Sequence, residues 1–303
     1  MSTSQTPLGF AWLEVTGFCN EVCDHCYADS SPRGTHGAMT VSDWTGVIDQ
    51  LADMGTADVQ FIGGEPTLYP HLRKLITHAH GAGLAVEVFS NLTHVRPELW
   101  ETFKECGVKL ATSYYSATPQ EHDKVTNLRG SHRKTRANIK KALDLGLQLR
   151  GGIVSVQAGQ RVHEAQRDLA ALGVPEVGAD RTRAFGRASR GAQPTINDLC
   201  GHCAQGKGAI GPNGDVWPCV LSRFLTTGNV RETPIAEVWA GARMSDVRRE
   251  LEAVHDGRGA QACTPPQFLP MCGPCQPCPP MVGHCDPREA DSPPAKATIS
   301  APA

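Results

Sequence analysis

The sequence predicts an α/β fold, a partial (β/α)6 barrel followed by a small, irregular, cysteine-rich C-terminal module. Between residues 11 and 180, short apolar runs alternate with helical stretches, and glycines end most of the helical stretches. After residue 190 the helical pattern fades, and cysteine, glycine and proline rise together. Strand–helix units in series indicate a parallel sheet with its helices outside, which right-handed crossovers curl into an open or closed barrel.

The first half of the barrel contains three strands and three helices. The segment Thr40-Val41-Ser42-Asp43 is typical of a capping box, and Gly55 is expected to stop the helix that it opens. The apolar face of this helix is predicted to consist of Trp44, Val47, Ile48, Leu51 and Met54. The remaining elements are expected as strands over Ala11–Thr16, Val59–Ile62 and Leu84–Phe89 and helices over Leu72–His80 and Pro97–Cys106.

The second half repeats the alternation. Gly146 and Gly173 each follow a helical stretch and are expected to end it. Strands are predicted over Val108–Ser113, Leu149–Val156 and Pro175–Gly178, and helices over Ser131–Leu145 and Val162–Leu172.

Composition excludes several classes of protein. The 29 basic and 31 acidic residues nearly balance, so no overall field favours nucleic acid or a membrane surface. The N-terminus lacks a signal-peptide pattern and no apolar run reaches the length of a membrane span, so we expect a cytoplasmic protein. In that reducing compartment, 12 cysteines favour metal binding or catalysis over disulfides.

Three cysteines near the N-terminus carry the functional signal. Cys19, Cys23 and Cys26 form a CxxxCxxC pattern, unlike the cysteine run of ferredoxins or the paired CxxC of structural zinc. A cubane cluster has four irons, so three thiolates leave one iron open for chemistry. The alternative is a zinc-binding loop, or chance in a cysteine-rich chain.

Parallel barrels place their chemistry on the loops that follow the carboxyl ends of the strands. The cysteine loop follows the first predicted strand, Gly63-Gly64-Glu65-Pro66 the second, Ser90-Asn91 the third and Ser113–Ser116 the fourth. We therefore expect one site on this rim. There the two glycines let the backbone approach a ligand and the Glu65 carboxylate accepts from an ammonium or hydroxyl. An ordinary strand-to-helix turn would also explain the glycines.

The CxxxCxxC pattern, with the GGEP sequence about 40 residues later, resembles the radical S-adenosylmethionine (radical SAM) superfamily. His25 stands where that family more often has Phe or Tyr. The resemblance implies a 4Fe-4S cluster on the three cysteines whose open iron chelates S-adenosylmethionine. It also implies reductive cleavage to a 5′-deoxyadenosyl radical that abstracts hydrogen from a substrate.

The family also suggests which residues hold the cofactor. By this resemblance Gly63, Gly64, Glu65 and Pro66 hold the methionine amino group, and Ser90 and Asn91 contact the ribose. Ser113 is the polar residue of the fourth strand, and Gly152-Ile153 packs against adenine. Loop capping or, for Gly152, a β-bulge would explain these residues equally well.

The C-terminal module is similar to the SPASM or twitch extension of radical SAM enzymes, which holds auxiliary 4Fe-4S clusters. The resemblance rests on Cys203, on Gly214 ahead of Cys219, and on the Gly228–Val230 and Glu237–Trp239 segments. The terminal cysteines depart from the usual spacing and favour one auxiliary cluster over two, with a structural zinc site as the alternative. The expected ligands of the first cluster are Cys203, Cys219, Cys272 and Cys275, and a second cluster would use Cys278 and Cys285.

The remaining cysteines and the basic residues suggest further roles. Cys200 and Cys263 are candidates for a hydrogen donor or substrate anchor, and Cys106 for a buried small hydrophobe. The basic stretch from Arg129 to Lys141 is expected to be a solvated helix face. A second stretch, expected to bind the cofactor carboxylate or an acidic peptide, consists of Arg181, Arg183, Arg187 and Arg190.

These observations predict a barrel domain over 1–190, an auxiliary iron–sulfur domain over 191–286 and a disordered tail over 287–303. The first functional hypothesis is a radical SAM enzyme that crosslinks, epimerises or oxidises a ribosomally made peptide. Since the sheet starts by about residue 11, we expect a separate leader-recognition protein or direct docking. A reductant such as flavodoxin or ferredoxin is the other expected partner. The alternatives are a carbohydrate or aminoglycoside dehydrogenase or epimerase, and a non-enzymatic iron–sulfur or zinc protein.

Overall fold

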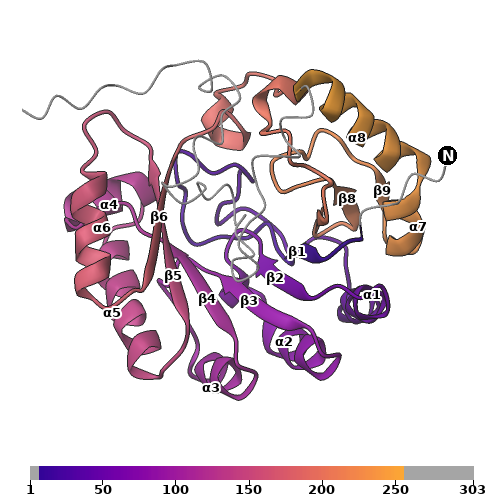
Figure 1. Cartoon of the computed structure of the whole chain (residues 1–303). Coiled ribbons are helices and arrows are strands. Elements are labelled where there is room, and N and C mark those ends of the chain that lie inside the picture. The colour runs from indigo at the N-terminus through magenta and orange to yellow at the C-terminus, as the bar shows by residue number, and fades with distance from the viewer. Residues whose placement is uncertain (1–6, 256–303) are drawn as a thin grey trace, which may run out of the picture.

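The computed structural model describes residues 7–255 and has one curved, nine-stranded sheet (Figure 1). The strand order is β6-β5-β4-β3-β2-β1-β7-β8-β9, and all pairs from β6 to β7 are parallel. This arrangement confirms the predicted α/β partial barrel. Its six barrel strands are β1 (Phe10–Glu14), β2 (Asp58–Ile62), β3 (Ala85–Phe89), β4 (Lys109–Ser113), β5 (Leu149–Ser155) and β6 (Glu176–Arg181).

Helices cover the outer face of these strands (Figure 1). Their apolar sides and the outward side chains of the strands form the main core, which includes Trp44, Phe61 and Phe103. Five of them match the predicted helices to within a residue or so at each end: α1 (Val41–Asp53), α2 (Leu72–Gly81), α3 (Pro97–Glu105), α5 (Ser131–Asp144) and α6 (Val162–Ala171).

Helix α1 shows how local sequence sets an element. The Thr40 hydroxyl accepts a hydrogen bond from the Asp43 amide at 3.1 Å, and the Asp43 carboxylate accepts from the Thr40 amide at 2.8 Å. This is the predicted capping box, which satisfies two backbone donors at the helix start. The predicted apolar residues Trp44, Val47, Ile48 and Leu51 are all buried.

Two helices were not predicted. Helix α4 (Pro119–Thr126) lies between β4 and α5, and helix α8 (Ala242–His255) lies in the segment where the helical pattern was expected to fade. Both are predominantly polar, and α8 buries only one narrow stripe that includes Met244, Val247 and Leu251. Their apolar stripes are too narrow for periodicity to stand out.

The C-terminal module continues the barrel sheet. Strand β7 (Lys207–Ile210) pairs in parallel with β1, so that Phe10 lies opposite Lys207. Strands β8 (Asp215–Trp217) and β9 (Gly228–Asn229) then follow antiparallel, and α7 (Ile235–Ala240) contacts α1. Strand β1 is therefore shared, with β2 on one side and the C-terminal module on the other.

A buried ion pair also joins the two parts. Glu14, at the end of β1, is 3% exposed and accepts hydrogen bonds from the guanidinium of Arg223. The Arg223 guanidinium carbon lies 5.3 Å from the Tyr27 ring centroid and 4.8 Å from the Trp217 ring centroid. Arg223 thus contacts aromatic rings of both parts, which strengthens their attachment.

Replacing Arg223 should destabilise the protein by leaving a buried charge without its partner. We expect Arg223→Ala to lower the free energy of unfolding by about 3–5 kcal/mol, measured by urea unfolding. The double variant Glu14→Leu/Arg223→Leu removes both charges, so its free energy of unfolding should fall much less. Equal losses in the two variants would show that the ion pair itself contributes little.

Candidate active site

The cysteine loop (residues 19–26) follows β1 and is fixed by backbone hydrogen bonds. The Cys19 amide donates to the Ser31 carbonyl at 3.1 Å, and the Gly17 amide donates to the Thr35 carbonyl at 2.8 Å. This folding brings Cys19, Cys23 and Cys26 to the wall of one cavity. The three thiols predicted as cluster ligands therefore face a common space.

The surroundings of these thiols fit an iron–sulfur cluster. The Glu21 amide lies 3.4 Å from the Cys19 sulfur and the Ser30 amide 3.4 Å from the Cys26 sulfur, and backbone donors of this kind stabilise cluster sulfurs. Burial raises the pKa of the Cys19 thiol, so metal coordination is needed to displace its proton. Within residues 7–255, no three metal-binding side chains converge on a point suited to a single ion.

The GGEP loop (residues 63–66) runs directly against the cysteine loop. The Gly64 amide donates to the Thr16 carbonyl at 2.7 Å, and the Glu65 amide donates to the Phe18 carbonyl at 2.8 Å. A Cβ on Gly63 would lie 2.4 Å from the Thr16 oxygen, and one on Gly64 would lie 2.3 Å from the Phe18 oxygen. The chain that leads into the cysteine loop therefore requires both glycines, whereas the sequence had suggested the approach of a ligand. Both still line the cavity.

Glu65 is buried and bonds to its own chain. Its Oε1 accepts from the Thr67 amide, the Thr67 hydroxyl and the Ser90 hydroxyl, and its Oε2 accepts from the Asn91 amide at 2.7 Å. The Glu65 carboxylate thus ties the loop after β2 to the loop after β3. Glu65, Pro66 and Ser90 do not line the cavity, so the structure places them behind its wall. For Ser90 this differs from the expected ribose contact.

The other predicted cofactor residues do line the cavity: Asn91 after β3, Ser113 in β4 and Ile153 in β5. The side-chain nitrogen of Asn91 donates to the side-chain oxygen of Asn20 at 2.9 Å. Leu221 of the C-terminal module closes the wall beside Tyr27, and Arg181 and Arg183 line it from the end of β6. The cavity is thus built from both parts of the chain.

His25 packs edge-on against Tyr115, with ring centroids 5.0 Å apart and an interplanar angle of 71°. Burial lowers its pKa to about 4, so the imidazole is neutral at pH 7. Both rings line the cavity. The residue before the last cysteine of the CxxxCxxC pattern is therefore a neutral imidazole here, at the position where Phe or Tyr is more common.

Arg187 holds the cysteine loop from outside, a role that the sequence did not reveal. Its guanidinium donates to the Cys23 carbonyl at 2.9 Å, the Ser30 carbonyl at 2.7 Å and the Asp29 carboxylate at 2.6 Å. These contacts engage the Arg187 guanidinium within the protein and place it outside the cavity lining, which differs from the expected contact with a cofactor carboxylate or an acidic peptide.

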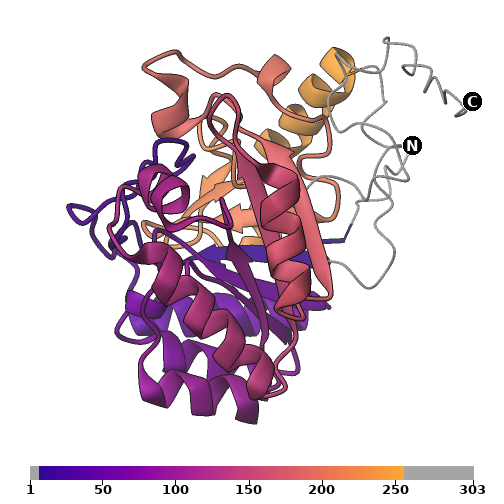
Figure 2. The ribbon, with the colours of Figure 1, turned by 90° about the vertical axis from the view of Figure 1, so that its left-hand side faces the viewer.

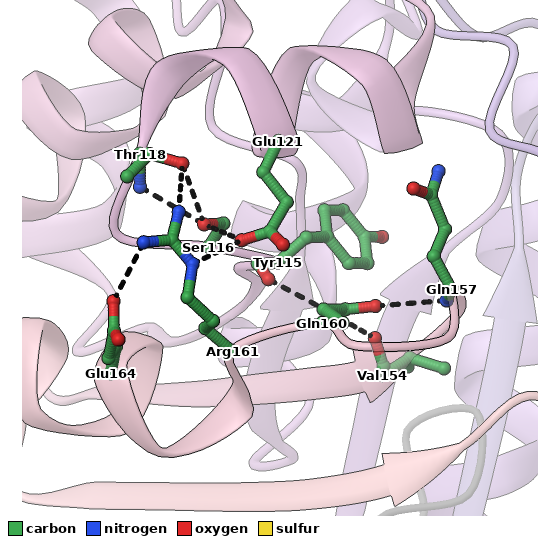
Figure 3. A network of polar contacts seen from close by, with 9 residues as sticks. All are labelled: Tyr115, Ser116, Thr118, Glu121, Val154, Gln157, Gln160, Arg161 and Glu164. Carbon is green, nitrogen blue, oxygen red and sulfur yellow. Dashed lines mark hydrogen bonds and ion pairs between the residues drawn. The ribbon is translucent and has the colours of Figure 1, made fainter.

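Gln160 fixes the opposite wall, as Figure 3 shows. Its side-chain nitrogen donates to the carbonyls of Tyr115 and Val154, each at 2.9 Å. Its side-chain oxygen accepts from the Val156 amide at 2.7 Å and the Gln157 amide at 3.2 Å. One side chain thereby joins the chain after β4 to the end of β5, and both Tyr115 and Val154 line the cavity.

Comparison with known proteins identifies the family. The model of the radical SAM superfamily matches residues 13–157, and the model of the SPASM iron–sulfur cluster-binding domain matches residues 200–279. The chain belongs to the radical SAM superfamily. It carries a C-terminal SPASM domain, so its cofactors are S-adenosylmethionine and 4Fe-4S clusters. The non-enzymatic alternative is therefore wrong.

Individual relatives of this radical SAM enzyme are distant. It is 24% identical to an AdoMet-dependent heme synthase of Methanosarcina barkeri over 91% of this chain and 93% of that protein. It is 25% identical to a PqqA peptide cyclase of Xanthomonas campestris over 79% of this chain and 75% of that protein. The structure of Streptococcus suis SuiB bound to its precursor peptide SuiA has a TM-score of 0.67 and 16% identity, over 80% of this chain and 67% of SuiB.

The SPASM domain brings three cysteines together. The sulfurs of Cys203 and Cys219 lie 3.1 Å apart, and a hydrogen bond from Cys203 is the main cause of a lowered pKa at Cys200. All three line a second cavity beside Trp12, and Cys200 does not line the first. Its place with Cys203 and Cys219 argues against a hydrogen donor or substrate anchor in the main cavity.

The other predicted cysteines have different outcomes. Cys106 packs against the apolar core, as expected of a small hydrophobe. Five cysteines lie outside the described residues: Cys263, Cys272, Cys275, Cys278 and Cys285. The predicted tail over 287–303 also lies outside them.

Between residues 7 and 255, no helix has the length and apolar character needed to cross a membrane.

Gly64→Ala should disrupt the cluster site, because the added Cβ meets the Phe18 carbonyl and forces the two loops apart. We expect loss of most of the iron bound at the cysteine loop after anaerobic reconstitution, measured by iron content and electron paramagnetic resonance. Gly46→Ala is the matched control, since a Cβ there has nothing within 4 Å. Full cluster assembly in Gly64→Ala would contradict the proposed packing.

Gln160→Ala should loosen the cavity wall while leaving the cluster in place. Two carbonyls and two amides lose this part-buried partner, so the wall loses the hydrogen bonds that join the chain after β4 to the end of β5. We expect the Kd for S-adenosylmethionine to rise at least about tenfold with unchanged iron content. Gln157→Ala is the control, because Gln157 bonds to Gln160 through backbone atoms, which the substitution keeps (Figure 3). Equal affinities in the two variants would exclude the positioning role.

Proposed function

We propose that this radical SAM enzyme modifies a ribosomally synthesised peptide by removing a hydrogen atom from one of its residues. The observation that carries the chemistry is the single cavity lined by the three thiols of the cysteine loop, Gly63, Gly64 and the polar ends of β3 and β4. Support for a peptide comes from similarity to a peptide cyclase over most of both chains. A shared fold with an enzyme crystallised with its precursor peptide is consistent with this.

The residues of the cavity fit the two cofactors. Cys19, Cys23 and Cys26 would hold the cluster, and Gly63, Gly64, Asn91, Ser113 and Ile153 would surround S-adenosylmethionine. When bound together, these groups supply reductive cleavage to a 5′-deoxyadenosyl radical. The chain contributes orientation through Gln160 and Arg187, and exclusion of water by the buried apolar residues Ile62, Ile153 and Leu221.

The auxiliary site is proposed to hold one cluster. Cys200, Cys203 and Cys219 would supply three of its ligands, with the fourth among the cysteines beyond residue 255. Cys200 thus replaces one of the four ligands predicted from the sequence. The aromatic side chain of Trp217 contacts Arg223, which also contacts Tyr27 beside the cysteine loop, so the two cysteine groups are held in a fixed relation.

The test is hydrogen transfer from a labelled peptide. The reconstituted enzyme is incubated with S-adenosylmethionine, dithionite and a deuterated short peptide encoded beside its gene, and 5′-deoxyadenosine is analysed by mass spectrometry. We expect deuterium in 5′-deoxyadenosine and a changed peptide mass. Cys19→Ala, Cys23→Ala and Cys26→Ala should each abolish cleavage while auxiliary iron stays bound. Cleavage without deuterium transfer from any neighbouring peptide would refute the peptide assignment.

A second candidate substrate is a haem precursor, because the heme synthase relative matches nearly the whole of both chains. The same assay with an iron porphyrin in place of the peptide separates the two. Carbohydrate and aminoglycoside substrates, the alternatives predicted from sequence, form a third arm of that assay.

A further inference from the structure

The radical SAM reaction consumes one electron for each molecule of S-adenosylmethionine cleaved, and a protein donor must come close to the cluster to supply it. Cys19, Cys23 and Cys26 line the cavity, while Val22 and Asp24 of the same short loop are exposed, Val22 to 36%. The cysteine loop is therefore a single layer of chain between the cluster site and solvent. A donor seated against Val22 would have the shortest route to the cluster on this face.

The cysteine loop rests on the α4–α5 junction (residues 127–130). The Val22 amide donates to the Thr126 carbonyl at 3.1 Å. The Asn127 side chain donates to the Val22 carbonyl at 2.9 Å and to the Asp24 carboxylate at 2.8 Å. Figures 1 and 2 show the loop beside α4. A protein that docks at the junction therefore contacts the loop as well.

The junction and the adjoining turns of α4 and α5 carry several basic side chains. Four cations here are exposed, and none of them forms an ion pair with another described residue. We call them the basic patch: Lys124, Arg129, Arg133 and Lys134. The neighbouring acids are engaged. The Asp123 carboxylate accepts hydrogen bonds from the backbone amides of Gly130 and His132 and from the Ser131 hydroxyl. The Glu121 carboxylate accepts from the Ser116 hydroxyl. The Asp24 carboxylate accepts from the Asn127 side chain.

This concentration of charge contrasts with the whole chain. The formal net charge is −2, yet four unpaired cations fall between residues 124 and 134. Arg136, farther along α5, is different because it pairs with Asp168 at 3.0 Å. The predicted solvated helix face, Arg129 to Lys141, thus contributes three exposed cations to the basic patch, whereas Arg136 and Lys140 form ion pairs and Lys141 lies over the Trp100 ring.

We propose that the basic patch, together with Val22, is the docking surface for the electron donor, an acidic one-electron carrier protein of the flavodoxin or ferredoxin type. An apolar centre bordered by unpaired cations fits the negatively charged surface around the redox group of such a carrier. Complementary charges would speed encounter and orient the donor toward the cysteine loop. In the step itself, the reduced carrier loses one electron and the cluster gains it.

The test compares a protein donor with a small-molecule donor. We replace Lys124, Arg129 and Arg133 by Glu and measure S-adenosylmethionine cleavage driven by reduced flavodoxin or by dithionite. We expect the flavodoxin concentration for half-maximal rate to rise at least about tenfold, with the dithionite-driven rate unchanged. Raising the salt concentration should weaken wild-type turnover with flavodoxin and hardly affect the variant.

A binding measurement keeps the test independent of turnover. Binding of oxidised flavodoxin to the reconstituted enzyme, measured by isothermal titration calorimetry, should weaken by a similar factor in the variant. The matched control is Arg73→Glu/Lys74→Glu, which reverses two exposed cations on α2. If the charge reversal disturbs folding, the milder Lys124→Gln/Arg129→Gln variant should show a smaller shift in the same direction.

Three outcomes would overturn the proposal. One is an equal effect of the α2 control, which would indicate a general charge effect. Another is an unchanged response to flavodoxin and to a 2Fe-2S ferredoxin in the charge-reversed variant. The third is a loss confined to peptide turnover under dithionite, which would assign the basic patch to an acidic segment of the substrate. The first two outcomes do not depend on whether the peptide assignment is right.

Discussion

The whole site depends on the close backbone contact between the chain leaving β1 and the chain leaving β2. Two hydrogen bonds, from the Gly64 amide to Thr16 and from the Glu65 amide to Phe18, extend the pairing of the two strands into their loops. No side chain fits between them. Because this contact sets the path of the cysteine loop, it also sets the positions of the three thiols. The thiols and both glycines of the GGEP loop then line one cavity.

The sharing of β1 explains how two groups of cysteines are held in one rigid unit. One edge of β1 pairs with β2 and the other with β7, and the cysteine loop leaves its carboxyl end. Glu14 at that end holds Arg223, which stacks between Tyr27 and Trp217. Backbone pairing and a buried ion pair thus act together, and the described part of the SPASM domain completes the wall of the barrel's cavity through Leu221.

The sequence predicted the features that depend on local pattern. Alternating apolar runs and stop glycines gave the six barrel strands and five helices, and the CxxxCxxC and GGEP patterns indicated the site. The structural roles of Gln160, Arg187 and Arg223 were missed because each acts through contacts with residues distant in the chain, and a single polar residue carries no periodic signal. Cys200 was predicted as a hydrogen donor or substrate anchor, because spacing alone does not show that it folds back onto Cys203 and Cys219.

Glu65 shows why a motif residue need not be a ligand contact. Burial raises the pKa of its carboxyl, while hydrogen bonds from Asn91, Thr67 and Ser90 oppose that shift and favour the charged form. These donors sit on the loops after β2 and β3, so the carboxylate fixes the distance between two loops that line the cavity. Of the four hydrogen bonds to the Glu65 carboxylate, Oε1 accepts three and Oε2 accepts one. The pattern that signals the cofactor site in the sequence is thus required first by the scaffold, and the proposed contacts with the cofactor are the residues at the cavity wall.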